Sequence, residues 1–302
     1  MEEEKTADRP DRLLKKICGG KLQNSLKVAL REQEKYQLFE KLPEEISIHV
    51  FKFLPIVDRI RIEKVCKSWQ ELAKQSWHNI KELKANPKFF GLKPRWYRYP
   101  KIDNVMLEAI LKRCGKYLEK INVESPNVYD GSYECPLSII AEYCPNLHSI
   151  TCNKFSVPGF EKLSEMCQKL FEISITSEIL KELNFEEILG NLISKNKKLR
   201  ILNIPKFIGN GAFLLKLPFE EITTIKIGQT YNNHNLIDAI KKSKNLSTFL
   251  YEDMNIIGEI ASSCANLTEL DLKWYGYIDN IDSMFSEIFK NNKKMKIVKI
   301  SY

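Results

Sequence analysis

One short phrase returns at nearly regular intervals beyond residue 100, and it limits the folds that the chain can adopt. In this phrase an apolar anchor is followed by apolar residues three and five positions later, as in CPNLHSITC, NKKLRILNI and CANLTELDL. Successive anchors lie 21 to 29 residues apart. Their mean spacing of about 25 residues is typical of a repeat made of one helix and one strand. The anchors are Leu118, Leu147, Leu170, Leu199, Ile222, Leu246, Leu267 and Met295.

Amphipathic runs such as LSIIAEY and FEKLSEM precede most of these phrases, and apolar-x-apolar spacing within each phrase predicts a short strand. A repeat of this size cannot close a core alone, so we expect the repeats to stack, with parallel strands on one side and helices on the other. The prediction is an α/β fold: a curved solenoid of about eight units over residues 102–302. The Ile222 phrase follows Pro218 without a long helical pattern, which leaves open whether it heads a repeat or an insertion.

Residues 42–77 have a different pattern, which predicts three short helices. Pro43 suits the first position of a helix because its missing N–H would have no partner there. Pro55 is expected to end this helix, and Asp58 is expected to cap the next one. The apolar stripe of the first helix comprises Ile46, Val50, Phe51 and Leu54, and that of the third comprises Val65, Trp69 and Leu72.

A unit of about forty residues buries little apolar surface. Each large apolar side chain left half exposed forgoes about 1.5–3 kcal/mol of burial, so such a unit usually needs a partner. Its Leu-Pro pair and its Val-Cys-Lys-Ser-Trp run, residues 65–69, resemble the F-box family. This resemblance implies a three-helix unit that docks on the Skp-type adaptor of cullin-RING ubiquitin ligases. A helical hairpin that merely caps the rest of the chain is the alternative.

The resemblance also implies which residues would bind the adaptor. Three of them, at positions 65, 66 and 69, are expected to contribute more to the core of the unit. The set is Leu42, Pro43, Ile46, Val50, Phe51, Leu54, Pro55, Val65, Cys66 and Trp69.

The repeats resemble the cysteine-containing leucine-rich repeat. An F-box followed by such repeats resembles the substrate-receptor subunits of SCF-type ubiquitin ligases. That pairing implies an adaptor without catalytic activity, which reaches cullin and the RING subunit through the Skp-type adaptor and holds an unidentified protein substrate. A leucine-rich-repeat scaffold that acts without ubiquitin transfer is the alternative.

Substrate is expected on the concave strand face, where side chains between the buried ones point outward. The residues placed there are Asn122, Thr151, Ser174, Asn203, Lys226, Leu250, Asp271 and Lys299. The loop KWYGYIDN adds Trp274, Tyr275 and Tyr277 as an aromatic cluster of the kind that interfaces favour, with packing on the solenoid rim as the alternative.

Eight cysteines without tight pairing do not indicate a disulfide framework. Four of them recur where helix turns into strand, which indicates a structural role: Cys114, Cys144, Cys167 and Cys264. A zinc set of Cys135, Cys144, His148 and Cys152 has separations that match no ligand knuckle. Neither a Gly-rich phosphate loop nor a nucleophile elbow is present in the sequence, so we expect no metal, no cofactor and no catalytic residue.

The remaining segments complete the predicted organisation. Residues 1–35 are expected to be disordered or a frayed helix, 36–80 to form the F-box, and 81–101 to form an aromatic-rich connector that caps the repeats. Aromatic and basic residues also alternate in the connector, so a nucleic-acid surface is its alternative reading.

Charge and hydropathy bear on partners and location. The net charge of +8 comes from scattered lysines, so we expect a solvated basic surface and no nucleic-acid partner, with a basic nucleic-acid binder as the alternative. The charged N-terminus lacks the apolar run of a signal peptide, and no window approaches the roughly 20 apolar residues of a membrane span. We therefore expect no membrane partner and an intracellular location, in the cytoplasm, the nucleus or both.

Overall fold

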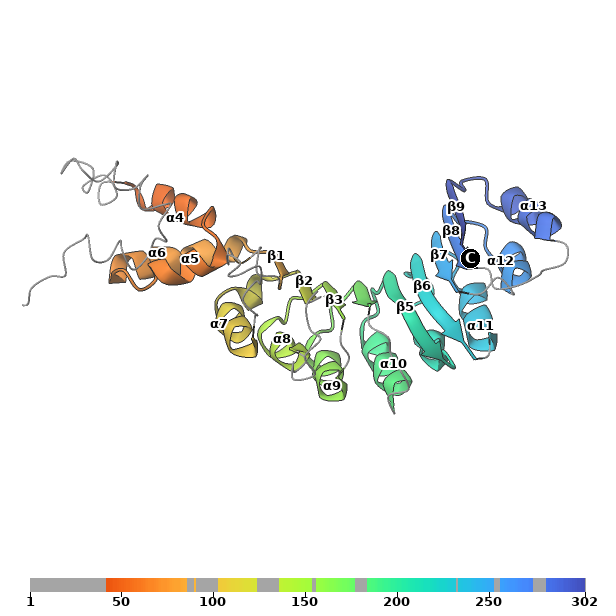
Figure 1. Cartoon of the computed structure of the whole chain (residues 1–302), viewed down its shortest axis with the longest axis horizontal. Helices are drawn as coiled ribbons and strands as arrows, with labels where there is room; N and C mark the ends of the chain where they lie inside the picture. The colour runs from red at the N-terminus through yellow and green to blue at the C-terminus, as the bar shows by residue number, and fades with distance from the viewer. Residues whose placement is uncertain are drawn as a thin grey trace, which may run out of the picture. The chain divides into compact units, whose positions relative to one another are not determined.

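The structure is a computed structural model of the chain (Figure 1), and it describes residues 42–85, 90, 103–123, 136–153, 156–176, 184–231, 233–252, 256–273 and 281–301. The chain divides into two compact units. Among the described residues, the N-terminal unit contains 42–80 and Phe90, and the C-terminal unit contains Lys81–Ala85 and everything from residue 103 onward.

Three helices form the N-terminal unit, which confirms the expected three-helix cluster: α4 (Glu44–Lys52), α5 (Ile56–Ile62) and α6 (Lys67–Ser76), followed by the 3₁₀ helix η2 (Trp77–Asn79). Pro43 and Pro55 immediately precede α4 and α5. The prediction that Asp58 caps the second helix is wrong, because Pro55 already starts that helix and Asp58 lies in its first turn. The Asp58 carboxylate instead pairs with Arg61 at 2.7 Å.

The core of the N-terminal unit is small. Phe51, Ile62, Leu72 and Ala73 are buried together, and Ile48, Leu54 and Trp69 pack against them while keeping part of their surface exposed. The Phe51 and Trp69 rings lie 5.4 Å apart between centroids.

A buried guanidinium joins the ends of two of these helices. Arg59 is only 5% exposed. Its Nε donates to the Leu54 carbonyl at 3.0 Å, and a second donor reaches the carbonyl of Lys52. Its Nη1 donates to the Ser76 carbonyl at 3.0 Å and to Asn79 Oδ1 at 3.2 Å. These bonds satisfy carbonyl groups that the C-terminal ends of α4 and α6 would otherwise leave unpaired.

The C-terminal unit is built on one nine-stranded sheet in which every strand pairs in parallel with its neighbours in the chain. The strands are β1 (Glu82–Lys84), β2 (Lys120–Val123), β3 (Ser149–Cys152), β4 (Glu172–Ile175), β5 (Ile201–Gly209), β6 (Thr224–Thr230), β7 (Thr248–Tyr251), β8 (Glu269–Lys273) and β9 (Ile297–Ser301).

Helices precede most of these strands and range along one side of the sheet in this unit (Figure 1), as the repeat pattern predicted. They are α7 (Asn104–Cys114) with the 3₁₀ turn η3 (Gly115–Tyr117), α8 (Leu137–Tyr143), α9 (Val157–Met166), α10 (Phe185–Lys195), α11 (His234–Lys242), α12 (Ile257–Ser263) and α13 (Ile281–Asn291). The predicted fold class, an α/β helix-strand solenoid after a helical unit, is confirmed.

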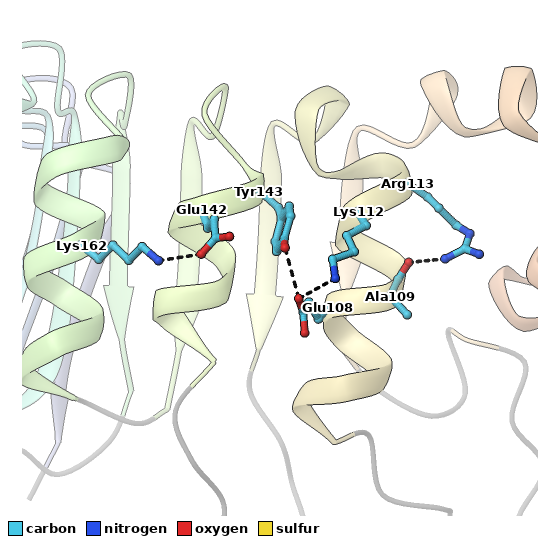
Figure 2. Close-up of polar contacts among 7 residues, drawn as sticks. All are labelled: Glu108, Ala109, Lys112, Arg113, Glu142, Tyr143 and Lys162. Atoms are coloured by element: carbon cyan, nitrogen blue, oxygen red, sulfur yellow. Dashed lines mark hydrogen bonds and ion pairs between the residues drawn. The ribbon is translucent and has the colours of Figure 1, made fainter.

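Ion pairs and hydrogen bonds link neighbouring helices on the outer side (Figure 2). Glu108 of α7 accepts from Lys112 at 2.8 Å and from the Tyr143 hydroxyl of α8 at 3.1 Å. Glu142 of α8 accepts from Lys162 of α9 at 2.7 Å. The hydrogen bond from Lys112, followed by that from Tyr143, lowers the pKa of Glu108 below its ordinary value. The charges of Glu108, Lys112, Glu142 and Lys162 are therefore matched within the chain.

The Ile222 phrase heads a true repeat with an unusual helix. Its anchor leads into β6 like the other anchors, but the preceding helical segment is the five-residue 3₁₀ helix η4 (Ala212–Lys216). Three aromatic rings fill the space beside it: Phe207 and Phe213 lie 5.0 Å apart in a T-shaped contact, and Phe185 lies 6.1 Å from Phe207.

Strand β1 lies within the segment 81–101 that was assigned to a connector. Ile80, Leu83 and Ala85 are buried and have the same three-and-five spacing as the phrases beyond residue 100, so the sequence did carry the signal. Phe90 is the only aromatic residue of that segment that the structure describes. Residues 1–41 also lie outside the described residues.

Buried asparagines hold successive repeats together where helix turns into strand. Asn196 is fully buried, and its Nδ2 donates to the Leu192 carbonyl of its own helix at 2.9 Å and to the Cys167 carbonyl of the preceding repeat at 3.1 Å. Its Oδ1 accepts from the Leu170 N–H at 2.7 Å. Asn292 makes the same three bonds, with Ile288, Cys264 and Leu267 as partners.

Replacing Asn196 with alanine is expected to lower the free energy of unfolding of the C-terminal unit by about 2 kcal/mol, because buried donors and acceptors would lose their partner. Asn191→Ala is the matched control, since Asn191 is exposed on the same helix. It should change the free energy by less than about 0.5 kcal/mol. Urea unfolding followed by circular dichroism measures both, and equal effects would refute the role assigned to Asn196.

The repeated cysteines are buried, as a structural role requires. Burial raises the pKa of the Cys167 and Cys264 thiols to about 12 and raises that of Cys144 further. The ordinary value is 9.0. The unfolded chain therefore releases thiol protons at a lower pH than the folded chain. The free energy of unfolding should consequently fall as pH rises from about 9 towards 12.

Alkylation at pH 8 should separate these thiols from Cys66, which is exposed. The thiolate is the reacting species, so iodoacetamide is expected to modify Cys66 in the native protein and to spare Cys144, Cys167 and Cys264 until urea is added. Mass spectrometry of the alkylated peptides gives the rates. Native Cys167 reacting as fast as Cys66 would contradict the burial.

Candidate functional site

An apolar surface lies on α4 and consists of Pro43, Ile46, Val50 and Phe53. The exposed fractions are 47% for Ile46, 37% for Val50 and 76% for Phe53. Residues three and four positions apart share one face of a helix, so these side chains form a continuous stripe. The His49 ring lies 5.0 Å from that of Phe53 in an edge-on contact. Such a stripe on a small unit is the kind of surface that a protein partner covers.

The structure divides the residues expected to bind an adaptor into three groups. Pro43, Ile46, Val50, Pro55 and Cys66 are exposed, whereas Leu42, Leu54, Val65 and Trp69 are partly buried. The third group is Phe51 alone, which is 2% exposed and belongs to the core of the unit. It is therefore placed to support α4 and not to contact a partner directly.

Phe53 was missed by the sequence reasoning. The prediction continued the stripe at four-residue steps from Val50 to Leu54, but α4 ends at Lys52. The chain turns at this point, so Leu54 packs on the core and Phe53 stays exposed. The three-residue step from Val50 to Phe53, which is equally compatible with one helix face, could have indicated it.

The second surface is the face of the sheet opposite the helices, the open face. Alternate strand residues such as Ile121, Ile150 and Ile173 are 0–2% exposed, which places the residues between them on the open face. All eight residues predicted for the substrate face fall in one register row, which Lys84 of β1 extends. The open-face row is Lys84, Asn122, Thr151, Ser174, Asn203, Lys226, Leu250, Asp271 and Lys299.

A second row runs beside it, two residues earlier in each strand: Glu82, Lys120, Ser149, Glu172, Ile201, Thr224, Thr248, Glu269 and Ile297. Most members of the open-face row are partly or fully exposed, but Ser174 is only 3% exposed. Its Oγ accepts from Asn203 Nδ2 at 2.8 Å, so these two side chains support each other. Whether the row binds a partner stays a prediction, and the aromatic candidates Trp274, Tyr275 and Tyr277 lie outside the described residues.

Within the described ranges, no group of three or more His, Cys, Asp or Glu side chains could hold a metal ion. The His148 ring instead stacks on Phe171 at 5.9 Å, while Cys135 lies outside those ranges. None of the described helices combines the length and the apolar composition that crossing a membrane requires.

Comparison with known proteins gives a family match for the N-terminal part of the chain. Residues 39–82 match the family model described as F-box-like. The chain is 23% identical over 292 residues to F-box/LRR-repeat protein 4 of Bos taurus, with 86% of this chain and 42% of that protein covered. It is also 30% identical over 135 residues to the putative RNA-binding protein EEED8.10 of Caenorhabditis elegans, with 44% of this chain and 18% of that protein covered.

The chain thus spans less than half the length of either relative. Among solved structures, it is similar to the leucine-rich repeat-containing protein LegL7 of Legionella pneumophila. The TM-score is 0.41 at 8% identity, over 82% of this chain and 86% of that one.

Proposed function

We propose that this chain, in which an F-box-like segment precedes leucine-rich repeats, is the substrate-receptor subunit of an SCF-type ubiquitin ligase. The observation that carries the proposal is the apolar surface on α4, within the residues that match the F-box-like model. The unit leaves Ile46, Val50 and Phe53 in water although its core is small. Covering them with an adaptor would bury apolar area and stabilise the unit, which is the expected behaviour of a docking segment.

In this function the chain positions other proteins and performs no chemistry. The α4 surface binds the Skp-type adaptor, and the adaptor links the chain to cullin and the RING subunit. The sheet holds a protein substrate on its open face. A substrate tethered in this way meets the ubiquitin-conjugating enzyme at an effective concentration of about millimolar, which accelerates transfer without a catalytic residue in the receptor. Such a ligase would act inside the cell, in the cytoplasm, the nucleus or both.

The polarity of the open-face row fits a protein substrate. The row is a mixture of amide and hydroxyl side chains, one leucine and charged side chains of both signs. A surface of this kind recognises a specific arrangement of side chains, whereas a phosphate backbone would favour a run of cations.

The test is co-expression of the chain with the Skp-type adaptor, followed by affinity purification and size-exclusion chromatography. We expect a stable complex with one copy of each protein. A well-folded chain that elutes apart from the adaptor would contradict the proposal and favour a leucine-rich-repeat scaffold that acts without ubiquitin transfer.

A further inference from the structure

The charges on the open face are unevenly matched along the sheet. Near its two ends, cations lie beside anions: Lys84 pairs with Glu82 at 3.4 Å, and Lys299 approaches Glu269 at 3.9 Å. Asp271 is in register with Lys299. These charges are therefore largely matched within the chain and offer little net attraction to a ligand.

Lys226, on β6, differs because its register neighbours are uncharged. Its register neighbours are Asn203 of β5 and Leu250 of β7, and Thr224 precedes it on the same face. Ile201 and Thr248 of the second row lie on the flanking strands and are likewise uncharged. Within the described part of the chain, the ammonium group of Lys226 makes no hydrogen bond or ion pair. It is half buried, so neighbouring side chains shield it partly from solvent.

The nearest acidic member of the open-face row is Asp271, two strands from Lys226. Neighbouring strands are about 4.8 Å apart, so the two backbones are separated by about 10 Å. Glu252 directly follows β7, and its carboxylate pairs with Lys273. Among the described residues at the centre of the open face, Lys226 is thus a positive charge without an ion-pair partner, and its register neighbours offer hydroxyl, amide and apolar groups.

We infer that the open face binds an extended peptide segment through an anionic side chain seated on Lys226, with an apolar side chain of the segment on Leu250. The inference rests on the proposed function and specifies the class of substrate. A cation in a partly desolvated, uncharged surrounding attracts an anion more strongly than one that already has a partner. Asn203 and Thr224 offer hydrogen-bonding groups beside it. A carboxylate or a phosphate supplies the same chemistry.

The experiment selects displayed random peptides on the full-length chain at low salt. A selected peptide is then synthesised with glutamate, phosphoserine or glutamine at its anionic position, and its affinity is measured by fluorescence anisotropy. We expect the selected peptides to be acidic and the glutamine version to bind about tenfold more weakly. Preference for phosphoserine over glutamate would identify phosphate as the anionic group that the site recognises. Equal binding of the two peptides would show that a carboxylate suffices.

Lys226→Gln should abolish the difference between the anionic and glutamine peptides. Lys197→Gln should leave it unchanged, because Lys197 is exposed in a helix-strand turn away from the strands. Leu250→Glu provides a second test: it places a carboxylate in register with Lys226, which should compete with the peptide and weaken binding by about tenfold. Selection without acidic enrichment, or a preference that survives Lys226→Gln, would overturn the inference.

Adaptor binding is measured in parallel by co-purification. Lys226→Gln should leave it intact, because Lys226 lies outside the F-box-like match. A chain that selects acidic peptides but does not bind the adaptor would contradict the proposed ligase function and support the peptide site. A chain that binds the adaptor but selects no acidic peptides would contradict the peptide site alone.

Discussion

Replacing Ile46 and Val50 together with aspartate is expected to weaken binding of the Skp-type adaptor by more than about a hundredfold. Both side chains are exposed on one face of α4 and contribute nothing to the buried core. Two carboxylates placed in an apolar contact would lose their water without gaining partners, in addition to the lost apolar burial. Circular dichroism should show an unchanged fold, and isothermal titration calorimetry measures the affinity.

The matched control introduces the same two charges at exposed apolar positions elsewhere. Val105 on α7 is 75% exposed and Met166 on α9 is 46% exposed. The double variant Val105→Asp, Met166→Asp should bind the adaptor like the original chain. If the α4 variant keeps its affinity, the adaptor does not use this surface. If both variants lose affinity equally, the loss reflects charge in general and the surface assignment is wrong.

Replacing Arg59 with methionine is expected to destabilise the N-terminal unit by about 3 kcal/mol. Methionine keeps much of the side-chain volume but removes the donors that satisfy the carbonyls of Lys52, Leu54 and Ser76. Buried acceptors that lose a charged donor cost more than those that lose a neutral one. Urea unfolding followed by tryptophan fluorescence measures the change, since Trp69 and Trp77 lie in this unit.

Arg61→Met is the control for this variant. Arg61 lies on the same helix, and its guanidinium pairs at the surface with Asp58. An exposed ion pair contributes between 0 and about 1 kcal/mol, so this variant should remain close to the original stability. Comparable losses for the two arginines would show that burial of Arg59 is not what stabilises the unit. Adaptor binding should weaken with Arg59→Met only to the extent that the unit unfolds.

The repeated part of the fold could be predicted because its signal is periodic. Each anchor lies two positions before a strand and all but Met295 are buried, and the alternation of a strand then assigns every residue to one of two faces. This is why Asn122, Lys226 and the rest of the predicted set fall in one register row. The phrase of β1 is less distinct, since it ends in the small residue Ala85 and precedes the regular series of anchors.

Other features depend on contacts between distant residues. Nothing in the local sequence distinguishes Arg59, which reaches a carbonyl 17 residues away, from Arg61, which pairs three residues away in solvent. Likewise, the amphipathic pattern of α4 could not separate Phe51, which faces α6, from the exposed Val50 beside it. The helix that carries the exposed apolar surface could thus be located from the sequence, but the residues that form this surface required the fold.

The order of the strands has a consequence for how the C-terminal unit acquires its structure. Each strand pairs only with the strands before and after it in the chain, so its backbone partners lie about one repeat away. Folding rates rise as contacts become more local, and solenoids can nucleate at one repeat and propagate to the next. The N-terminal repeats leave the ribosome first. Each newly completed repeat can therefore pack on a preceding repeat that has already folded. Nucleation can therefore begin during synthesis, well before the last strand has been translated.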